Sequence, residues 1–320
     1  MKIFTLVLII LLLVGCAAQQ AEPMDEYAST IRIAALRGPT ALGLLQLMDS
    51  GGQSSNTYEF EILGSPDEIP PLLARGEIDI AVVPSNLAAV LYNRTEGAVQ
   101  SLAVVTLGVL HIVDTTGTIY SVADLAGQTI FTSGATPEFA LNYVLTQNGL
   151  RPGVDVFIEI RAEHTEIAAL LQTGQAEIAL LPEPFVSTTL AQIDGLHLAL
   201  DLTEEWDRVQ NDYSLIMSVV IGRREFIENN LESVSILMEE YAKSIDFVSN
   251  NISEGAQLAV DFGIIPNTAI AETALPRTHL VFLSGEEMRR HLTGFYNVLY
   301  NANPDSIGGE LLEESFFFLP

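Results

Sequence analysis

Residues 67–84 read DEIPPLLARGEIDIAVVP, and residues 165–182 read TEIAALLQTGQAEIALLP. The two stretches align without a gap, and ten of twenty-four positions are identical when residues 61–84 are placed against residues 159–182. In each stretch, apolar residues at helical spacing precede a short apolar run of the kind that forms a buried strand. The shared glycine and proline stand where a helix and a strand should end. We therefore predict two similar α/β units in one chain.

The alternation of strand and helix patterns continues outward from both stretches. Such alternation favours βαβ units with parallel strands. The predicted strands are residues 30–36, 58–63 and 78–84 in the first unit, and residues 127–133, 154–161 and 176–182 in the second.

Two stretches connect the units and are interpreted as a hinge, with its centres near residues 106–112 and 201–217. Residues 101–117 are a long apolar strand candidate, and residues 196–222 are a linker that ends in another apolar strand. The chain beyond them is mostly helical in pattern and is expected to cover the first unit. The predicted fold class is α/β, with two similar βαβ lobes: residues 31–107 and 217–320 form lobe 1, and residues 108–216 form lobe 2.

The composition limits the function. The chain has 320 residues, 48% of them hydrophobic, which is enough for real cores and excludes disorder. Its formal net charge is -27, whereas nucleic-acid binding needs a basic surface. We expect no nucleic-acid partner, and we interpret the acidic surface as a source of solubility.

The N-terminus has the pattern of an export signal. Residues 1–15 combine Lys2 with an apolar run that is shorter than the about 20 residues of a membrane span. The run ends in LVGC, which resembles a bacterial lipobox, and Cys16 is the only cysteine. We expect Cys16 to carry a lipid that anchors the protein outside the cell membrane, with residues 16–30 as a tether. The alternative is an ordinary cleaved signal with an incidental thiol.

Four stretches carry a resemblance to a known family: IRIAALRGPTALGLLQLMD, GEIDIAVVPSNLAAVLYN, SVADLAGQTIFTSGATPEFALNYVLTQNGL and IALLPEPFVSTTL. Together with the lipobox and the double crossover, they resemble a bacterial ABC-importer substrate-binding lipoprotein with the type II periplasmic-binding fold. Within that fold, the sequence is similar to the group that binds nitrate, sulfonates, taurine and thiamine-pyrimidine precursors. The resemblance implies a monomer that captures a small organic anion or heterocycle by lobe closure, delivers it to a membrane permease, and needs no cofactor.

The candidate site consists of four junctions where a predicted strand passes into a helix. Ligands of open parallel sheets bind beyond the carboxyl ends of the strands. Free amides and hydroxyls at helix starts suit an anion, and Thr40 and Ser85 also have the character of helix caps. The alternative is that all these residues only cap helices. The candidate ligand-binding residues are Gly38, Pro39 and Thr40; Ser85 and Asn86; Ser133, Gly134, Ala135 and Thr136; and Glu183 and Pro184.

Glu183 stands where the first unit has Ser85, so the two units differ in charge at this junction. A carboxylate could bind an amine or a ring N–H of the ligand, or could serve as a favourable acid at a helix start. Three aromatic residues could supply a stacking wall. For Phe139 and Phe185 core packing is the better interpretation, whereas Trp206, in the second crossing, could face the ligand.

Other function classes have weaker support. The five histidines are scattered and no thiolate pair exists, so we expect no metal site. No hydrolase elbow or nucleotide-binding loop is present. We expect no enzyme, although enzymes that make the thiamine pyrimidine and a dehydratase of menaquinone synthesis share the fold. The alternatives are a thiamine-pyrimidine-precursor binding protein and a lipid-anchored ligand-sensing subunit.

Overall fold

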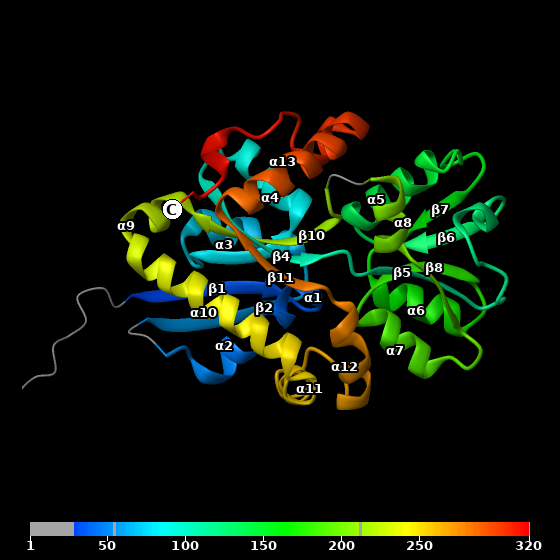
Figure 1. The fold of residues 1–320 in the computed structure, drawn as a ribbon, viewed down its shortest axis with the longest axis horizontal. Coiled ribbons are helices and arrows are strands. Elements are labelled where there is room, and N and C mark those ends of the chain that lie inside the picture. Colours follow the sequence, from blue (N-terminus) through cyan, green and yellow to red (C-terminus); the bar gives the residue numbers. More distant parts are fainter. Residues whose placement is uncertain (1–28, 54–55, 211–212, 320) are drawn as a thin grey trace, which may run out of the picture.

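The computed structural model describes residues 29–53, 56–210 and 213–319, whose strands form two separate sheets (Figure 1). We call the part built on the six-stranded sheet lobe 1 and the part built on the five-stranded sheet lobe 2. The predicted signal peptide, Cys16 and the predicted tether up to residue 28 lie outside the described residues, whereas Thr30, the last residue of the predicted tether, begins the first strand. Within the described part of the chain, every helix is too short or too polar to cross a membrane.

The sheet of lobe 1 has three parallel strands followed by antiparallel ones. Ile33 of β1 (Thr30–Leu36) pairs with Phe60 of β2 (Thr57–Leu63) on one side and with Ile80 of β3 (Ile80–Pro84) on the other. Strands β1 and β3 are apolar along most of their length because helices cover both faces of the sheet. In spatial order the strands are β11 (Leu280–Ser284), β4 (Val99–Leu107), β10 (Ile216–Arg223), β3 (Ile80–Pro84), β1 (Thr30–Leu36) and β2 (Thr57–Leu63).

The sheet of lobe 2 repeats this arrangement. Three parallel strands are followed by an antiparallel strand, β5, that arrives from lobe 1, just as β10 arrives in lobe 1 from lobe 2. In spatial order its strands are β7 (Phe157–Ile160), β6 (Thr129–Thr132), β8 (Ile178–Pro182), β5 (Leu110–Asp114) and β9 (His197–Asp201). The α/β prediction with two similar lobes is therefore confirmed.

The repeat in the sequence corresponds to one helix and one strand in each lobe. Helix α3 (Ile69–Arg75) precedes β3, and helix α6 (His164–Gln172) precedes β8. Gly76 and Gly174 have φ angles of 65° and 69°, which is the left-handed conformation that glycine adopts at helix ends. The shared glycines thus set the same turn between helix and strand in both lobes.

The remaining helices cover the two sheets on both faces (Figure 1). The C-terminal helices pack on lobe 1, as predicted, and α12 also lies beside α7 of lobe 2. In lobe 1 they are α1 (Pro39–Leu42), α2 (Leu45–Ser50), α4 (Ser85–Arg94), α9 (Arg224–Asn229), α10 (Leu231–Asn250), α11 (Ile252–Asp261), α12 (Thr268–Ala274) and α13 (Gly285–Ala302). In lobe 2 they are α5 (Ala135–Gln147), α7 (Phe185–Gln192) and α8 (Leu202–Val209).

The crossings between the lobes differ from the prediction in detail. The first consists of two successive strands in different sheets, β4 and β5, separated at Gly108, where any Cβ would overlap with Thr203 of α8. The second is not a plain linker, because it contains β9 and α8. Strand β11 was also not predicted; its preceding loop contacts the first crossing, since His279 O accepts a hydrogen bond from Leu107 N at 3.2 Å. The imidazole of His279 also bonds to the carbonyl of Gly108.

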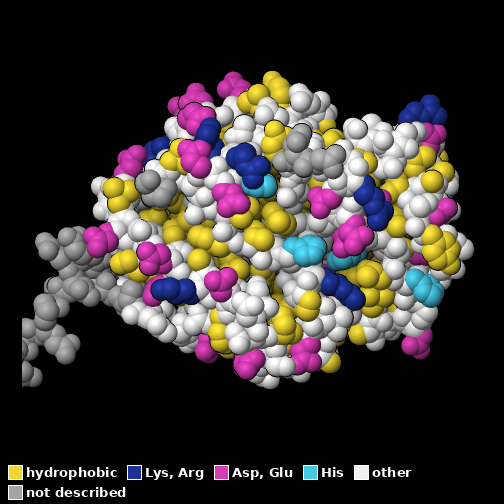
Figure 2. Space-filling model, in the orientation of Figure 1, with side chains coloured by type: hydrophobic (Ala, Val, Ile, Leu, Met, Phe, Trp, Pro, Cys, Tyr) yellow, Lys and Arg dark blue, Asp and Glu magenta, His cyan; other side chains and the backbone are white. Residues whose placement is uncertain are grey.

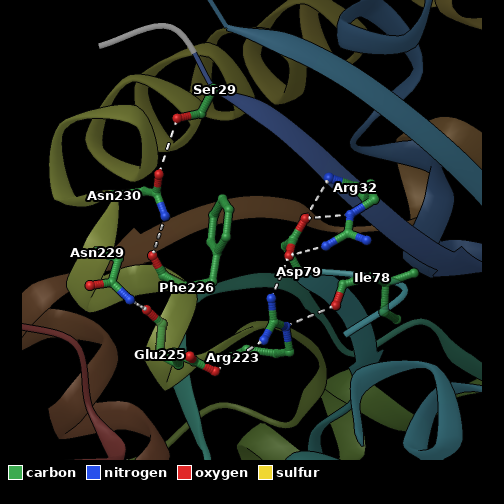
Figure 3. A network of polar contacts seen from close by, with 9 residues as sticks. All are labelled: Ser29, Arg32, Ile78, Asp79, Arg223, Glu225, Phe226, Asn229 and Asn230. Atoms are coloured by element: carbon green, nitrogen blue, oxygen red, sulfur yellow. Dashed lines mark hydrogen bonds and ion pairs between the residues drawn. The ribbon is translucent and has the colours of Figure 1, made fainter. Parts of the chain in front are cut away.

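A buried ion-pair network ties together the amino-terminal end of the parallel strands in lobe 1 (Figure 3). Asp79, only 1% exposed, accepts hydrogen bonds from Arg32 at 2.7 and 2.8 Å and from Arg223 at 2.8 Å. Burial opposes the charge of Asp79, but these two guanidinium groups outweigh it and hold its pKa below the usual range. The network lies at the opposite end of the strands from the candidate junctions, so its role is structural.

Candidate functional site

The four candidate junctions meet between the lobes. Thr136, in the first turn of α5, donates a hydrogen bond at 2.8 Å to Oδ1 of Asn86, in the first turn of α4. On the other side, a Cβ placed on Gly38 would lie 3.9 Å from Cε2 of Phe185, the first residue of α7. In the sequence repeat, the Gly38 junction of lobe 1 corresponds to the Thr136 junction of lobe 2. In space, however, the Gly38 junction faces the junction before Phe185, and the Thr136 junction faces the junction of Asn86. This crosswise arrangement results when a rotation relates two similar lobes and brings their junctions face to face.

The predicted capping roles of Thr40 and Ser85 are wrong. Thr40 lies inside α1 and donates to the carbonyl of Leu36 at 2.5 Å, and Ser85 donates to the carbonyl of Ile216 at 2.7 Å. Neither helix has a side-chain cap, because Gly38 and Pro84 occupy the cap positions. In this conformation the hydroxyl hydrogens of Thr40 and Ser85 are already used, so these oxygens offer a solute only acceptor lone pairs.

Helices α4 and α5 present uncapped amino ends to the cleft. Their cap positions are Pro84 and Gly134, and neither residue supplies a side-chain hydrogen bond to the first turn. The first amides of a helix have no partner inside the helix and carry partial positive charge. Ser133 and Thr136 are 4% and 3% exposed, so this part of the cleft is nearly closed. Two facing helix starts of this kind can bind an anionic or hydrogen-bond-accepting group.

Glu183 serves as an acid at a helix start, the second of the two predicted roles. Its carboxylate is fully buried and accepts hydrogen bonds from Ser187 N at 3.0 Å and from Ser187 Oγ at 2.9 Å, in the first turn of α7. Arg277 of lobe 1 approaches it at 3.4 Å and forms an ion pair between the lobes. Burial raises the pKa of Glu183, while Ser187 and Arg277 act against this rise. Contact between Glu183 and a solute stays a prediction.

Trp206 lies in an aromatic cluster that joins the lobes. The indole is fully buried, and its N–H donates to the carbonyl of Tyr213 at 2.9 Å. Its ring centroid is 4.5 Å from that of Tyr143, 6.1 Å from that of Phe139 and 6.0 Å from that of Phe295 on α13. Because Trp206 has no exposed surface here, a direct contact with a solute stays a prediction.

The two other aromatic candidates have different positions. Phe139 is 9% exposed and packs with the aromatic cluster, in accord with core packing. Phe185 is half-buried beside the Gly38 junction, and its ring lies 4.9 Å from the ring of His164. Burial lowers the pKa of His164 to about 4, so this imidazole is neutral at physiological pH.

Sequence reasoning missed a group of ionisable residues at the hinge. His111 is 2% exposed, and its Nδ1 lies 3.8 Å from Oδ2 of Asp201. Burial lowers the pKa of His111; Asp201 opposes this, and Arg277 and His279 add to it. On the face of the molecule drawn in Figure 2, histidine, acidic and basic side chains gather near the middle, where the lobes meet. His111 lies on β5, Asp201 ends β9, and Arg277 and His279 lie just before β11, so these three distant parts of the chain are brought together only by the fold.

Comparison with known families identifies the chain. A family model described as NMT1/THI5 like matches residues 59–254, which is more than half of the chain. The chain belongs to the NMT1/THI5 like family. The match extends over parts of both lobes of this family member, including three of the four junctions. A search of curated proteins found no match.

Solved structures share the fold of this NMT1/THI5 like protein. An ABC transporter structure from Parabacteroides distasonis has a TM-score of 0.77 at 22% identity, over 90% of this chain and 98% of that chain. The periplasmic aliphatic sulphonate binding protein SsuA from Escherichia coli has a TM-score of 0.71 at 16% identity, over 91% and 92%. The periplasmic nitrate-binding protein NrtA from Synechocystis PCC 6803 has a TM-score of 0.63 at 13% identity, over 87% and 84%. The two-lobed periplasmic-binding fold expected from the sequence is confirmed.

Proposed function

We propose that this chain is the solute-binding lipoprotein of an ABC importer, which captures a small organic anion or heterocycle between its lobes. The observation that carries the proposal is the contact between Thr136 and Asn86, because it brings two uncapped helix starts together from opposite lobes. The names of SsuA and NrtA, sulphonate- and nitrate-binding proteins of the same fold, support an anionic solute. The protein acts as a monomer and has no catalytic role.

Capture occurs by closure of lobe 1 (residues 31–107 and 217–320) on lobe 2 (residues 108–216). The lobes rotate about residues 106–112 and 201–217, where Gly108 and α8 are in close contact. A solute favours the closed form only if it contacts both lobes. Asn86 and the amino end of α4 supply one side, and Thr136 and the amino end of α5 supply the other. A membrane permease then recognises the closed form, which is the usual use of hinge closure in such proteins.

A screen of solutes tests this function. Thermal unfolding is measured with nitrate, sulfonates, taurine and thiamine pyrimidines, since a solute that binds only the folded state raises the Tm. Any bound pyrimidine favours the alternative function of thiamine-pyrimidine-precursor binding. A neighbouring permease gene supports import, whereas a neighbouring histidine-kinase gene supports a ligand-sensing subunit.

The variants Thr136→Ala and Ser85→Ala test the cleft. Loss of Thr136 removes a hydroxyl at the contact between the lobes, so we expect affinity for the solute found in the screen to fall about tenfold. Ser85→Ala removes the bond to the carbonyl of Ile216 beside the start of α4, and affinity should fall less. Isothermal titration measures both, with Thr173→Ala on the exposed end of α6 as the control. Unchanged affinity in both variants would show that the solute binds elsewhere.

The proposed anchoring has its own test. Replacing Cys16 by serine removes the only thiol, so a lipid can no longer be attached. We expect the wild-type protein in the membrane fraction of a bacterial host and Cys16→Ser in the soluble extracytoplasmic fraction, as judged by immunoblot. Equal distribution of the two would exclude anchoring through Cys16.

A further inference from the structure

A cavity of about 760 Å³ lies beside the junction contact, between α5 of lobe 2 and the end of α13 of lobe 1. Ala135, next to Thr136 at the start of α5, lines it at one end. The opposite wall continues from α13 into the short helix Pro304–Ile307. The cavity is thus part of the cleft between the lobes, and its size suits an organic molecule better than an inorganic ion.

The charged residues of the cavity wall are all acidic. Glu138 stands on the α5 side and Asp305 on the opposite side, and no lysine or arginine is among the described residues that line the cavity. A cleft lined by charges of one sign concentrates the potential of that sign. The cavity therefore disfavours an anion and favours a cation, in contrast to the helix starts beside it.

The other walls provide a ring-sized apolar surface and hydrogen-bond acceptors. Phe139 and Tyr143 line the cavity from α5, and Val298 faces them from α13. The amide side chains of Gln147 and Asn301 also line the cavity, and their oxygens can accept hydrogen bonds. An ammonium group supplies donors for such oxygens, and it also interacts favourably with aromatic rings.

We propose that this cavity binds a positively charged, amine-bearing group attached to a flat apolar body, and that this group is one end of the solute. The inference rests on the proposed function, since it assigns the second end of a solute whose anionic or acceptor end lies at α4 and α5. The alternative occupant, a metal ion, lacks support, because the described residues contain no cluster of three or more metal-ligating side chains.

Benzylamine is a suitable probe, with benzyl alcohol as the neutral analogue and phenylmethanesulfonate as the anionic one. Trp206 is the only tryptophan, and its ring lies 4.5 Å from Tyr143 of the cavity wall, so its fluorescence reports occupancy. We expect benzylamine to bind most tightly, and its affinity to fall with added salt. The proposal is overturned if benzyl alcohol binds as tightly as the amine, or if benzylamine does not bind at millimolar concentration.

Variants of the cavity wall separate charge from shape. Glu138→Gln and Asp305→Asn should each weaken benzylamine binding about two- to fivefold and leave benzyl alcohol unaffected. The effect is modest because an ion pair between the amine and either carboxylate is partly exposed to solvent. Glu166→Gln, which removes an acid from the first turn of α6 in the same lobe, is the matched control. Ala302→Phe fills the cavity from the end of α13 and should abolish binding of both probes. If Glu138→Gln and Asp305→Asn bind benzylamine as the wild type does, the proposal is wrong.

The proposed function and this inference can fail separately. A screened solute whose affinity depends on Thr136 but not on Glu138 or Ala302 would support the proposed function and overturn the cavity assignment. Conversely, benzylamine binding that depends on Glu138, in a protein to which no screened solute binds, would support the cavity and count against the import function.

Discussion

At the residue scale, three buried ionisable groups differ in how burial and neighbouring charges shift their pKa values. Asp79 is stabilised in its charged form by two arginines, whereas the pKa of Glu183 is raised, because burial there outweighs the bonds from Ser187 and Arg277. His111 has no hydrogen-bond partner for either ring nitrogen within the described part of the chain, and burial keeps it neutral. The sequence marks none of these differences, because each depends on partners distant along the chain.

The variant Asp79→Asn should destabilise lobe 1. It leaves Arg32 and Arg223 without their shared carboxylate, and both are partly exposed, at 36% and 21%. We therefore expect a loss of about 2–3 kcal/mol in the free energy of unfolding, below the range for a fully buried pair. Urea denaturation at neutral pH measures it, with the exposed Asp49→Asn as the control.

The effect of Asp79→Asn should depend on pH. A carboxylate whose pKa is lowered by folding adds stability above its unfolded pKa of about 3.9, and this stability is lost as the pH falls through the folded value. The difference between wild type and Asp79→Asn should therefore shrink below about pH 4. A difference that stays constant into that range would show that Asp79 contributes through packing and not through its charge.

At the scale of elements, the sequence predicted the parts that local patterns specify. The helix–strand pairs α3–β3 and α6–β8 were found because their apolar spacing and the closing Gly76 and Gly174 act over a few residues. The short strands β9 and β11 were missed: β9 has two exposed and two half-exposed residues, and β11 is half-buried, so neither has a continuous buried pattern. The sequence pattern predicts a linker where α8 lies, because charged residues make up much of the helix.

The packing of the second crossing on α13 gives a prediction at this scale. Tyr213 lies against Gly294, where a Cβ would overlap with the tyrosine ring. In an open helix, Gly→Ala stabilises by about 1 kcal/mol. Here we expect Gly294→Ala to destabilise the protein by about 1–3 kcal/mol, because overpacking outweighs propensity. Thermal unfolding measures the change, and Thr293→Ala on the exposed face of α13 is the control; an increased Tm for Gly294→Ala would contradict the close contact.

At the scale of the whole molecule, contacts between the lobes set the balance of open and closed forms. Besides Thr136 with Asn86, the ion pair of Glu183 with Arg277 links them, as does the aromatic cluster of Trp206, Phe139 and Phe295. A solute adds contacts to those that already favour closure. Affinity therefore depends on residues such as Arg277 even where they do not contact the solute.

The variant Arg277→Gln tests this balance. It leaves the Glu183 carboxylate buried without its cation, so we expect the closed form to lose about 1 kcal/mol, since Arg277 is 35% exposed. The radius of gyration from small-angle X-ray scattering should increase at neutral pH. Because the pKa of Glu183 is raised, acidification protonates it and should reduce the difference from wild type. Arg290→Gln on α13 is the control; an unchanged radius at every pH would contradict a role for this ion pair in closure.

The sequence by itself determined the two α/β lobes, their order along the chain, the crossings and the four junctions. The physical reason is that helices, strands and the turns between them follow from apolar spacing and from glycine and proline over short distances. Only the tertiary structure decided which junctions face each other and that Arg277 pairs with Glu183. It also decided that the hydroxyls of Thr40 and Ser85 donate their hydrogen bonds to backbone carbonyls inside the protein. It also placed α5 against α13 to form the acidic cavity. These features depend on contacts between residues far apart in the chain, which no local pattern encodes.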